Sequence, residues 1–122
     1  DFTKVAKVRC INFNEADLLT CFSNDYGYEN WVSNALNFYA DQNDLVILIS
    51  SSGKSKNILN GAKMAKKKKC KVITFSGFKK QNPLSKLGNY NFWVDSRNYN
   101  IVENVHQVWL LSLVDKIAKT KI

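Results

Sequence analysis

The sequence predicts an α/β protein in which helices cover both faces of a mostly parallel sheet, a three-layer α/β/α sandwich. Short apolar segments alternate along the chain with longer segments whose apolar residues recur every three or four positions. This order is typical of parallel strands joined by right-handed crossover helices. One apolar segment, Leu45–Ile49, is an unbroken apolar run bounded by polar turns. Such a run predicts a strand that is buried on both faces, as strands of parallel sheets usually are.

The first half of the chain is expected to contain two strands with a helix between them. Residues 8–13, Val-Arg-Cys-Ile-Asn-Phe, predict a short strand, and Asp17 can cap a brief helical turn that follows it. The composition of residues 24–27, Asn-Asp-Tyr-Gly, favours a turn. A helix is expected over residues 29–40, because its apolar positions have helical spacing. These positions are Trp31, Val32, Ala35, Leu36 and Tyr39. The strand Leu45–Ile49 comes next.

The second half repeats the alternation. A helix is expected over residues 56–68, followed by a strand over residues 71–75. Asn82 and Pro83 are expected to begin a short helix, since proline is tolerated in a first turn, with Leu84 and Leu87 facing the core. A short strand over residues 91–94 and a long final helix from residue 99 or 100 to residue 118 complete the pattern.

The length and composition indicate one globular domain that covers residues 1–122. No apolar run reaches the roughly 20 residues that a membrane-spanning helix needs, and no signal peptide opens the chain. The three cysteines, Cys10, Cys21 and Cys70, are odd in number and match no zinc spacing. We therefore expect reduced thiols in a cytoplasmic protein without a membrane partner.

The formal net charge is +8, and much of it comes from lysines near the predicted end of one helix. These are Lys63, Lys66, Lys67, Lys68, Lys69 and Lys71. A cationic patch is typical of nucleic-acid-binding surfaces. Lysines at a helix end more often form a solvated face, however, and no aromatic residue lies between these to stack on bases. We expect no nucleic-acid partner, although the positive surface would attract anionic substrates.

A serine-rich loop, Ser50-Ser51-Ser52-Gly53-Lys54-Ser55, joins the strand Leu45–Ile49 to the next predicted helix. Ligands of open α/β sheets bind at such strand-to-helix junctions. The hydroxyls of Ser50, Ser51, Ser52 and Ser55 can each donate to a phosphate oxygen, and Gly53 lets the backbone turn sharply beside an anion. The helix N-terminus adds N–H groups and a positive dipole end.

The alternative is a turn that only caps the helix, but capping needs one serine and leaves the others without a role. The loop is not a nucleotide P-loop, because Leu48 stands where that pattern requires its first glycine. The spacing therefore favours a phosphate-binding loop.

The segment Ile-Ser-Ser-Ser-Gly-Lys-Ser-Lys-Asn-Ile-Leu resembles the signature of the sugar isomerase (SIS) domain family, and within it that of the phosphoheptose isomerases. Three other segments are similar to that family: its Asn-Asp-Tyr-Gly turn, its Lys-Val-Ile strand ending in glycine, and the beginning of its last helix. These lie at residues 23–28, 71–77 and 102–106. The resemblance covers about residues 1–118.

The resemblance implies a flavodoxin-like SIS fold and an aldose–ketose isomerase that acts on a sugar phosphate such as sedoheptulose 7-phosphate. It implies that the serine loop binds the substrate phosphate and that Asn24 and Asp25 contact the sugar. Homodimers or homotetramers are expected by the same resemblance. The alternative is a non-catalytic phosphosugar-binding module that regulates a partner, because the serine motif is shared by enzymes and regulators.

The chain departs from the phosphoheptose isomerase pattern in two places. Members of that family carry N-terminal helices, a glycine-rich loop and a His-x-x-x-Glu pair, none of which is in this chain, so we expect an N-terminal part to be missing. In the last helix, Glu103 stands at the position of a metal-binding glutamine, and Leu111 at that of a second histidine. The resemblance does not carry the family's zinc site over to this chain, and a divalent metal such as zinc stays open.

His106 is the only histidine of the chain, and Glu103 lies one helical turn before it. Isomerisation needs a base near the first two sugar carbons and an acid for the carbonyl oxygen, and histidine suits this at neutral pH. The pair is expected to be catalytic, as acid and base or as two ligands of a metal. The alternative is a structural histidine that hydrogen-bonds to Glu103.

The last predicted helix is apolar on more than one side, which indicates burial against more than one neighbour. Its apolar residues are Val105, Val108, Trp109, Leu110, Leu111, Leu113, Val114 and Ile117. The sheet can cover only one side of this helix. We therefore expect a homo-oligomer that uses it as an interface, the alternative being a core helix of a monomer.

Overall fold

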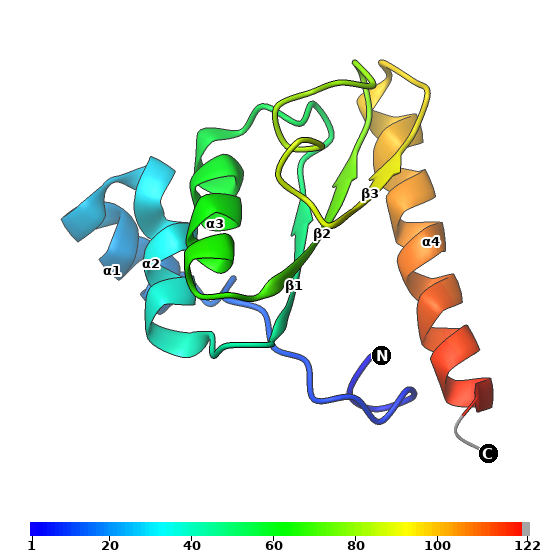
Figure 1. The fold of residues 1–122 in the computed structure, drawn as a ribbon, viewed down its shortest axis with the longest axis horizontal. Helices are drawn as coiled ribbons and strands as arrows, with labels where there is room; N and C mark the ends of the chain where they lie inside the picture. The colour runs from blue at the N-terminus through cyan, green and yellow to red at the C-terminus, as the bar shows by residue number, and fades with distance from the viewer. Residues whose placement is uncertain (121–122) are drawn as a thin grey trace.

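A three-stranded parallel sheet forms the centre of the computed structural model, which describes residues 1–120. The strands are β1 (Leu45–Ile49), β2 (Lys71–Ser76) and β3 (Tyr90–Trp93), hydrogen-bonded in the order β1-β2-β3. All neighbouring strands are parallel, so their carboxyl ends meet at one edge of the sheet. The loops that leave these ends lie together at the top of Figure 1.

Helices cover the two faces of the sheet, as Figure 1 shows. On one face, α3 (Lys56–Lys67) packs against β1 and β2, while α4 (Tyr99–Thr120) packs against β2 from the other. Alternate side chains of a strand point to opposite faces. Val72 accordingly joins the core on the α3 side, and Phe75 lies against aromatic side chains of α4. The predicted three-layer α/β/α architecture is confirmed.

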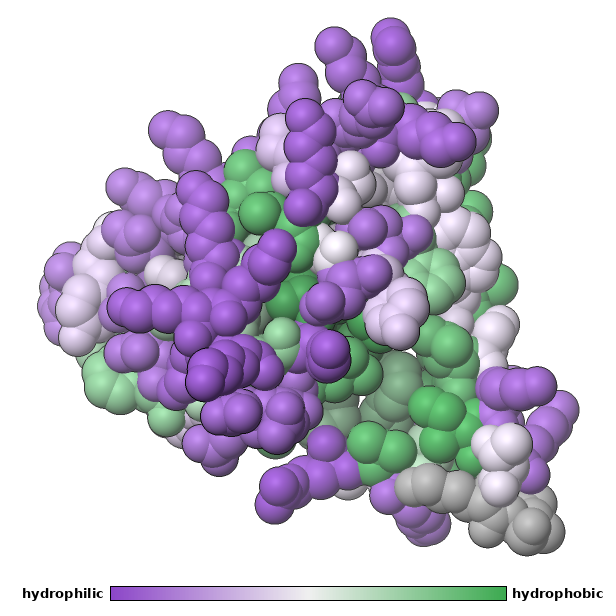
Figure 2. All heavy atoms as spheres, in the orientation of Figure 1, coloured by the Kyte–Doolittle hydropathy of each residue, from purple (hydrophilic) through white to green (hydrophobic). Residues whose placement is uncertain are grey.

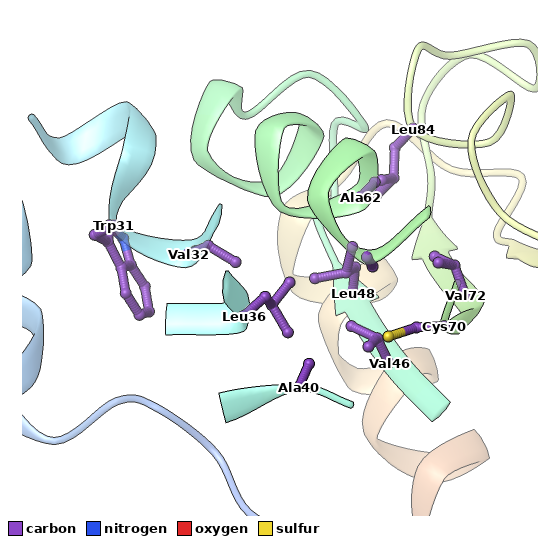
Figure 3. Packing of buried hydrophobic residues seen from close by; sticks show 11 residues of the cluster. Trp31, Val32, Leu36, Ala40, Val46, Leu48, Ala62, Cys70, Val72 and Leu84 are labelled. Atoms are coloured by element: carbon purple, nitrogen blue, oxygen red, sulfur yellow. The ribbon is translucent and has the colours of Figure 1, made fainter. Parts of the chain in front are cut away.

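Two further helices lie outside α3 on the same face. The helix α2 (Trp31–Tyr39) packs on α3, and α1 (Ala16–Tyr26) packs on α2 through the short 3₁₀ turn η1 (Tyr28–Asn30) and direct contacts. This layer holds the main apolar core, in which side chains of α2, α3, β1 and β2 point toward one another (Figure 3). The core residues are Trp31, Val32, Leu36, Ala40, Val46, Leu48, Ala62, Ala65, Cys70, Val72 and Leu84.

The predicted strand over residues 8–13 is wrong. This segment has no regular secondary structure, and both Val8 and Ile11 are exposed. A strand is stabilised by a hydrogen-bonded neighbour. Within residues 1–120 the sheet offers this segment no neighbour, so the sheet has three strands where the alternation predicted four.

The predicted turn at residues 24–27 begins later than expected. Asn24 and Asp25 still belong to α1, and Gly27 ends that helix with φ of +83°. Asp17 is not the N-cap of α1. It lies inside the first turn of the helix, where its carboxylate accepts from the N–H of Leu18. The first helix is therefore longer than the sequence indicated.

Two other expectations need correction. Residues 82–88 form a series of turns and not a helix, although Leu84 is fully buried as predicted. The strand β1 is not buried on both faces, because Leu45 and Ile49 are exposed among the described residues. The remaining strands and helices lie within a few residues of the predicted bounds. None of the helices within residues 1–120 is long and apolar enough to cross a membrane.

Candidate functional site

The serine loop leaves the carboxyl end of β1 and enters α3, as the sequence predicted. Two backbone hydrogen bonds attach it to the neighbouring strand end. The N–H of Ser50 donates to the carbonyl of Phe75 over 3.0 Å, and the N–H of Gly77 donates to the carbonyl of Ser51 over 2.8 Å. The loop therefore lies at the edge of the sheet where ligands of open α/β folds bind.

The hydroxyls of this loop do not cap the helix that follows. Ser55 occupies the N-cap position of α3, yet its side chain makes no capping hydrogen bond within the described chain. Its hydroxyl instead accepts from that of Ser50 over 3.0 Å, and the hydroxyl of Ser52 accepts from the N–H of Lys54 over 3.3 Å. The first N–H groups of a helix have no intrahelical acceptor. The loop thus combines unpaired donor capacity with the positive end of a helix.

Gly53 shapes the loop. Its φ of +67° lies in the left-handed region that glycine adopts without strain, and its N–H donates to the carbonyl of Ser50 over 2.9 Å. A Cβ atom at this position would collide with the side chain of Asn82. Glycine is thus required here for its backbone conformation and for the close approach of the next loop.

A hydrogen bond joins the serine loop to the last helix. The hydroxyl of Ser51 donates to Oε1 of Glu103 over 3.1 Å. Glu103 lies in the second turn of α4, which begins at Tyr99. This contact brings the predicted phosphate-binding loop and the predicted catalytic helix into one site.

His106 is 2% exposed and lies one turn farther along α4. Its Nε2 is 3.1 Å from the carbonyl oxygen of Ser76. Because a carbonyl only accepts, Nε2 carries the proton in the neutral ring, and Nδ1 is then a bare acceptor. Among residues 1–120, Nδ1 has no hydrogen-bond partner. The alternative of a structural histidine that hydrogen-bonds to Glu103 is not what the structure shows, because the ring bonds to Ser76 and Glu103 accepts from Ser51.

Burial lowers the pKa of His106 below its ordinary value, because the charged imidazolium loses water. The hydrogen bond to Ser76 and the charge of Glu103 act in the opposite direction and are smaller. The lowered pKa favours the neutral form of the ring. A neutral imidazole with a free Nδ1 can accept a proton.

Two cavities adjoin this site. One, of about 390 Å³, lies along α4 and is lined by Phe2, Ile49, Glu103, His106 and Leu111 among others. Figure 2 shows a hollow flanked by apolar atoms between the sheet and the lower part of α4.

The other cavity, of about 550 Å³, is lined by Ser55 and Lys56 of the α3 entrance and by Tyr28 and Glu29 of η1. Ile49, the last residue of β1, lines both cavities. The cavities thus share a lining residue at the end of β1, and Ser55 of the serine loop lines the second of them.

The family described as SIS domain matches residues 1–77 of the chain, from the N-terminal segment through the serine loop to the end of β2. The chain belongs to the SIS domain family. The phosphoheptose isomerase of Fusobacterium nucleatum is 26% identical over 109 residues, which cover 89% of this chain and 56% of that protein. A probable phosphoheptose isomerase of Thermoplasma volcanium is 33% identical over 88 residues, or 72% of this chain and 44% of that protein.

The fold of this SIS domain is also that of a solved structure. A phosphoheptose isomerase from Francisella tularensis superposes with a TM-score of 0.81 at 24% sequence identity, over 87% of this chain and 56% of that one. The chain spans roughly half the length of the relatives that it matches. The structural similarity supports the three-layer fold.

The SIS domain brings together most, but not all, of the predicted site residues. Ser50, Ser51, Ser52, Gly53 and Ser55 form one loop. Glu103 is hydrogen-bonded to this loop, and His106 lines one cavity together with Glu103. Asn24 and Asp25 are exposed in the last turn of α1, where they hydrogen-bond to each other over 3.0 Å. Neither residue lines the two cavities described above.

Sequence reasoning missed several residues that line the site. Tyr28 and Glu29, just after the predicted turn, line the cavity at Ser55, and the strand residue Ile49 lines both cavities. Asn82, which packs on Gly53, was noticed only as a helix start. The signal available for Tyr28 and Glu29 was their position beside the Asn-Asp-Tyr-Gly segment.

The residues described do not fit a zinc site by themselves. No group of three or more His, Cys, Asp or Glu side chains that could hold a metal occurs within residues 1–120. Zinc takes three or four protein ligands, and this helix supplies two candidates, Glu103 and His106.

Proposed function

We propose that this SIS domain is the phosphosugar-binding part of an aldose–ketose isomerase of the phosphoheptose type. The observation that supports it most is the hydrogen bond from Ser51 to Glu103, because it places the hydroxyl-rich loop against the helix of His106. The names of the relatives favour an isomerase over a non-catalytic regulatory module.

The substrate phosphate binds the serine loop in this proposal. The hydroxyls of Ser52 and Ser55 are free to donate to its oxygens, while those of Ser50 and Ser51 donate to the phosphate only after turning away from Ser55 and Glu103. Gly53 has no side chain that would keep the phosphate away from the backbone. The N-terminus of α3 adds its dipole, and the positive net charge of the chain draws the anion in. The absence of a capping bond at Ser55 supports this use of the loop, because the hydroxyl is not committed to the helix.

The sugar lies toward α4 in the same proposal. His106 removes a proton from the carbon next to the carbonyl, which forms an enediol, and returns it to the other carbon. Its Nδ1 is buried in the free protein and must become exposed to the cavity along α4 for this step. Glu103 is placed to hold a substrate hydroxyl or to move the proton of the carbonyl oxygen, since it shares one helix face with His106. Asn24 and Asp25 stay predicted sugar contacts.

We also propose a cytoplasmic homo-oligomer, with a sugar phosphate as its ligand. Three free cysteines support a reducing compartment. Exposed apolar side chains on α4, which include Val108 and Leu111, support assembly through that helix. A nucleic-acid partner forms no part of the proposal.

The test is proton exchange at C1 and C2 of sugar phosphates in deuterated water, followed by NMR on the intact protein that contains this chain. Sedoheptulose 7-phosphate is the first substrate, with hexose and pentose phosphates beside it. We expect exchange with the heptose phosphate. If calorimetry shows binding and no phosphate of the three sugar classes exchanges, the chain is a non-catalytic phosphosugar-binding module.

A further inference from the structure

Asn82 lies in the loop between β2 and β3, and its amide side chain is buried, with 1% of the residue exposed. Burying an amide is unfavourable unless its donors and acceptor are paired. Here Nδ2 donates to Oγ of Ser76 and to the carbonyl of Lys79, each over 2.9 Å, and Oδ1 accepts from the N–H of Ser85 over 2.9 Å. The amide is therefore held by partners on three sides.

The same side chain rests on the serine loop. It fills the space into which a Cβ of Gly53 would project, and the N–H of Leu84 donates to the carbonyl of Gly53 over 3.1 Å. The loop that carries Asn82 therefore contacts the serine loop at Gly53, the residue with a left-handed backbone conformation.

Asn82 and His106 are linked through one shared residue, Ser76. Ser76 accepts from Asn82 through its hydroxyl and from Nε2 of His106 through its carbonyl. Gly77, the next residue, donates to the carbonyl of Ser51. A short chain of hydrogen bonds thus joins Asn82 to His106 on one side and to the serine loop on the other.

Turn formation alone does not explain this arrangement. An asparagine that only stabilises a turn accepts from a backbone N–H a few residues on, as Oδ1 does from Ser85. That role does not account for the hydrogen bond from Nδ2 to Ser76 or for the packing of Asn82 on Gly53.

We infer that Asn82 is a positioning residue that holds the serine loop and His106 in register with each other. The inference rests on the proposed function for the chemistry that is positioned. The hydrogen bonds that link Asn82, Ser76 and His106 are present without a ligand and do not depend on that function.

The experiment is Asn82→Ala in the intact protein, with two measurements. The first is the ¹⁵N NMR signature of the His106 imidazole, which is assigned by its loss in His106→Gln. The second is the affinity for sedoheptulose 7-phosphate by calorimetry. We expect the ¹⁵N–H signal of Nε2 to shift or broaden although Asn82 does not touch His106, and the affinity to fall about tenfold, the scale of a lost buried hydrogen bond or two.

Two variants separate positioning from mere folding. Asn89→Ala removes an asparagine that accepts from the N–H of Val72 at the opposite end of β2, and it should change neither measurement. Asn82→Asp keeps an acceptor for Ser85, but it replaces the donor by an oxygen that faces the carbonyls of Lys79 and Gly77, so it should behave like Asn82→Ala. Wild-type signals in Asn82→Asp would reduce Asn82 to a turn residue and overturn the inference.

The remaining outcomes are also decisive. If Asn82→Ala fails to fold, Ser76→Ala removes only the hydroxyl acceptor and should shift the same His106 signal. An unchanged signal in that variant overturns the inference. If the wild-type protein binds no sugar phosphate, the proposed function fails, while the imidazole signature still decides the role of Asn82.

Discussion

The hydroxyl of Ser51 and the carboxylate of Glu103 are 3.1 Å apart, although 52 positions of sequence separate them. This contact is the place where a loop at the end of β1 meets the first turns of α4. Both residues were singled out by sequence, one for phosphate binding and the other for proton transfer. Their hydrogen bond makes one site of two separate predictions.

The serine hydroxyls are expected to account for phosphosugar affinity. Replacing Ser52 and Ser55 together by alanine should weaken binding of sedoheptulose 7-phosphate by about 1–3 kcal/mol, because bonds to a charged group are lost. Calorimetry measures the effect. The control is Ser112→Ala, whose hydroxyl bonds only to the carbonyl of Val108 within α4. Unchanged affinity in the double variant would place the phosphate elsewhere.

Removing the imidazole should affect the reaction more than binding. His106→Asn is expected to slow proton exchange at the sugar carbons by about 10²–10⁴-fold, the range for a lost general base, and to leave affinity nearly intact. The control is Asn104→Ala, an exposed neighbour on α4 that bonds only to the carbonyl of Asn100. Equal exchange rates in wild type and His106→Asn would make His106 a structural residue.

The buried histidine should also make stability depend on pH. Its pKa is lower in the folded protein than in the unfolded chain, so the unfolded chain binds more protons as pH falls. The free energy of unfolding should therefore decrease as pH falls below about 6.5, the ordinary pKa of histidine. Urea denaturation at several pH values tests this. His106→Gln should lose part of the decrease, and an identical pH profile in that variant would contradict the argument.

Alanine at position 53 should damage the serine loop. A side chain there must adopt a left-handed conformation, which costs about 1–2 kcal/mol, and its Cβ would collide with Asn82. We expect Gly53→Ala to lower the free energy of unfolding by more than this strain. The variant Gly53→Ala with Asn82→Ala separates the two effects, because it keeps the backbone strain and removes the side chain that the Cβ would meet. If Gly53→Ala costs the same in urea denaturation with Asn82 and with alanine at position 82, the collision makes no contribution.

The last helix should mediate self-association. Val108 is 61% exposed and Leu111 is 44% exposed, which is unfavourable for apolar side chains unless a partner covers them. Light scattering of the intact protein should show an oligomer, and Val108→Glu with Leu111→Glu should dissociate it. Lys116→Glu, an exposed charge change on the same helix, should leave the oligomer intact. A monomer in the wild type at high concentration would refute the proposal.

Local patterns were sufficient to predict much of the fold and one part of the site. The bounds of β1 follow from the apolar run Leu45–Ile49 alone, since a strand of this kind differs sharply from its polar flanks. The serine loop could be identified in the same way, because its hydroxyls, glycine and helix start are adjacent in sequence. Residues 8–13 look equally strand-like, yet they form no strand, because pairing depends on a neighbour and not on composition.

By itself, the sequence determined the layer order, the serine loop and the helix that carries Glu103 and His106. The tertiary structure alone decided which side chains meet: Ser51 with Glu103, Gly53 with Asn82, and Ser76 with His106. It also placed Asn24 and Asp25 away from the described cavities. The physical reason is that periodicity and turn chemistry act between near neighbours, whereas these contacts join residues from separate strands, loops and helices and arise only when the sheet brings its strand ends to one edge.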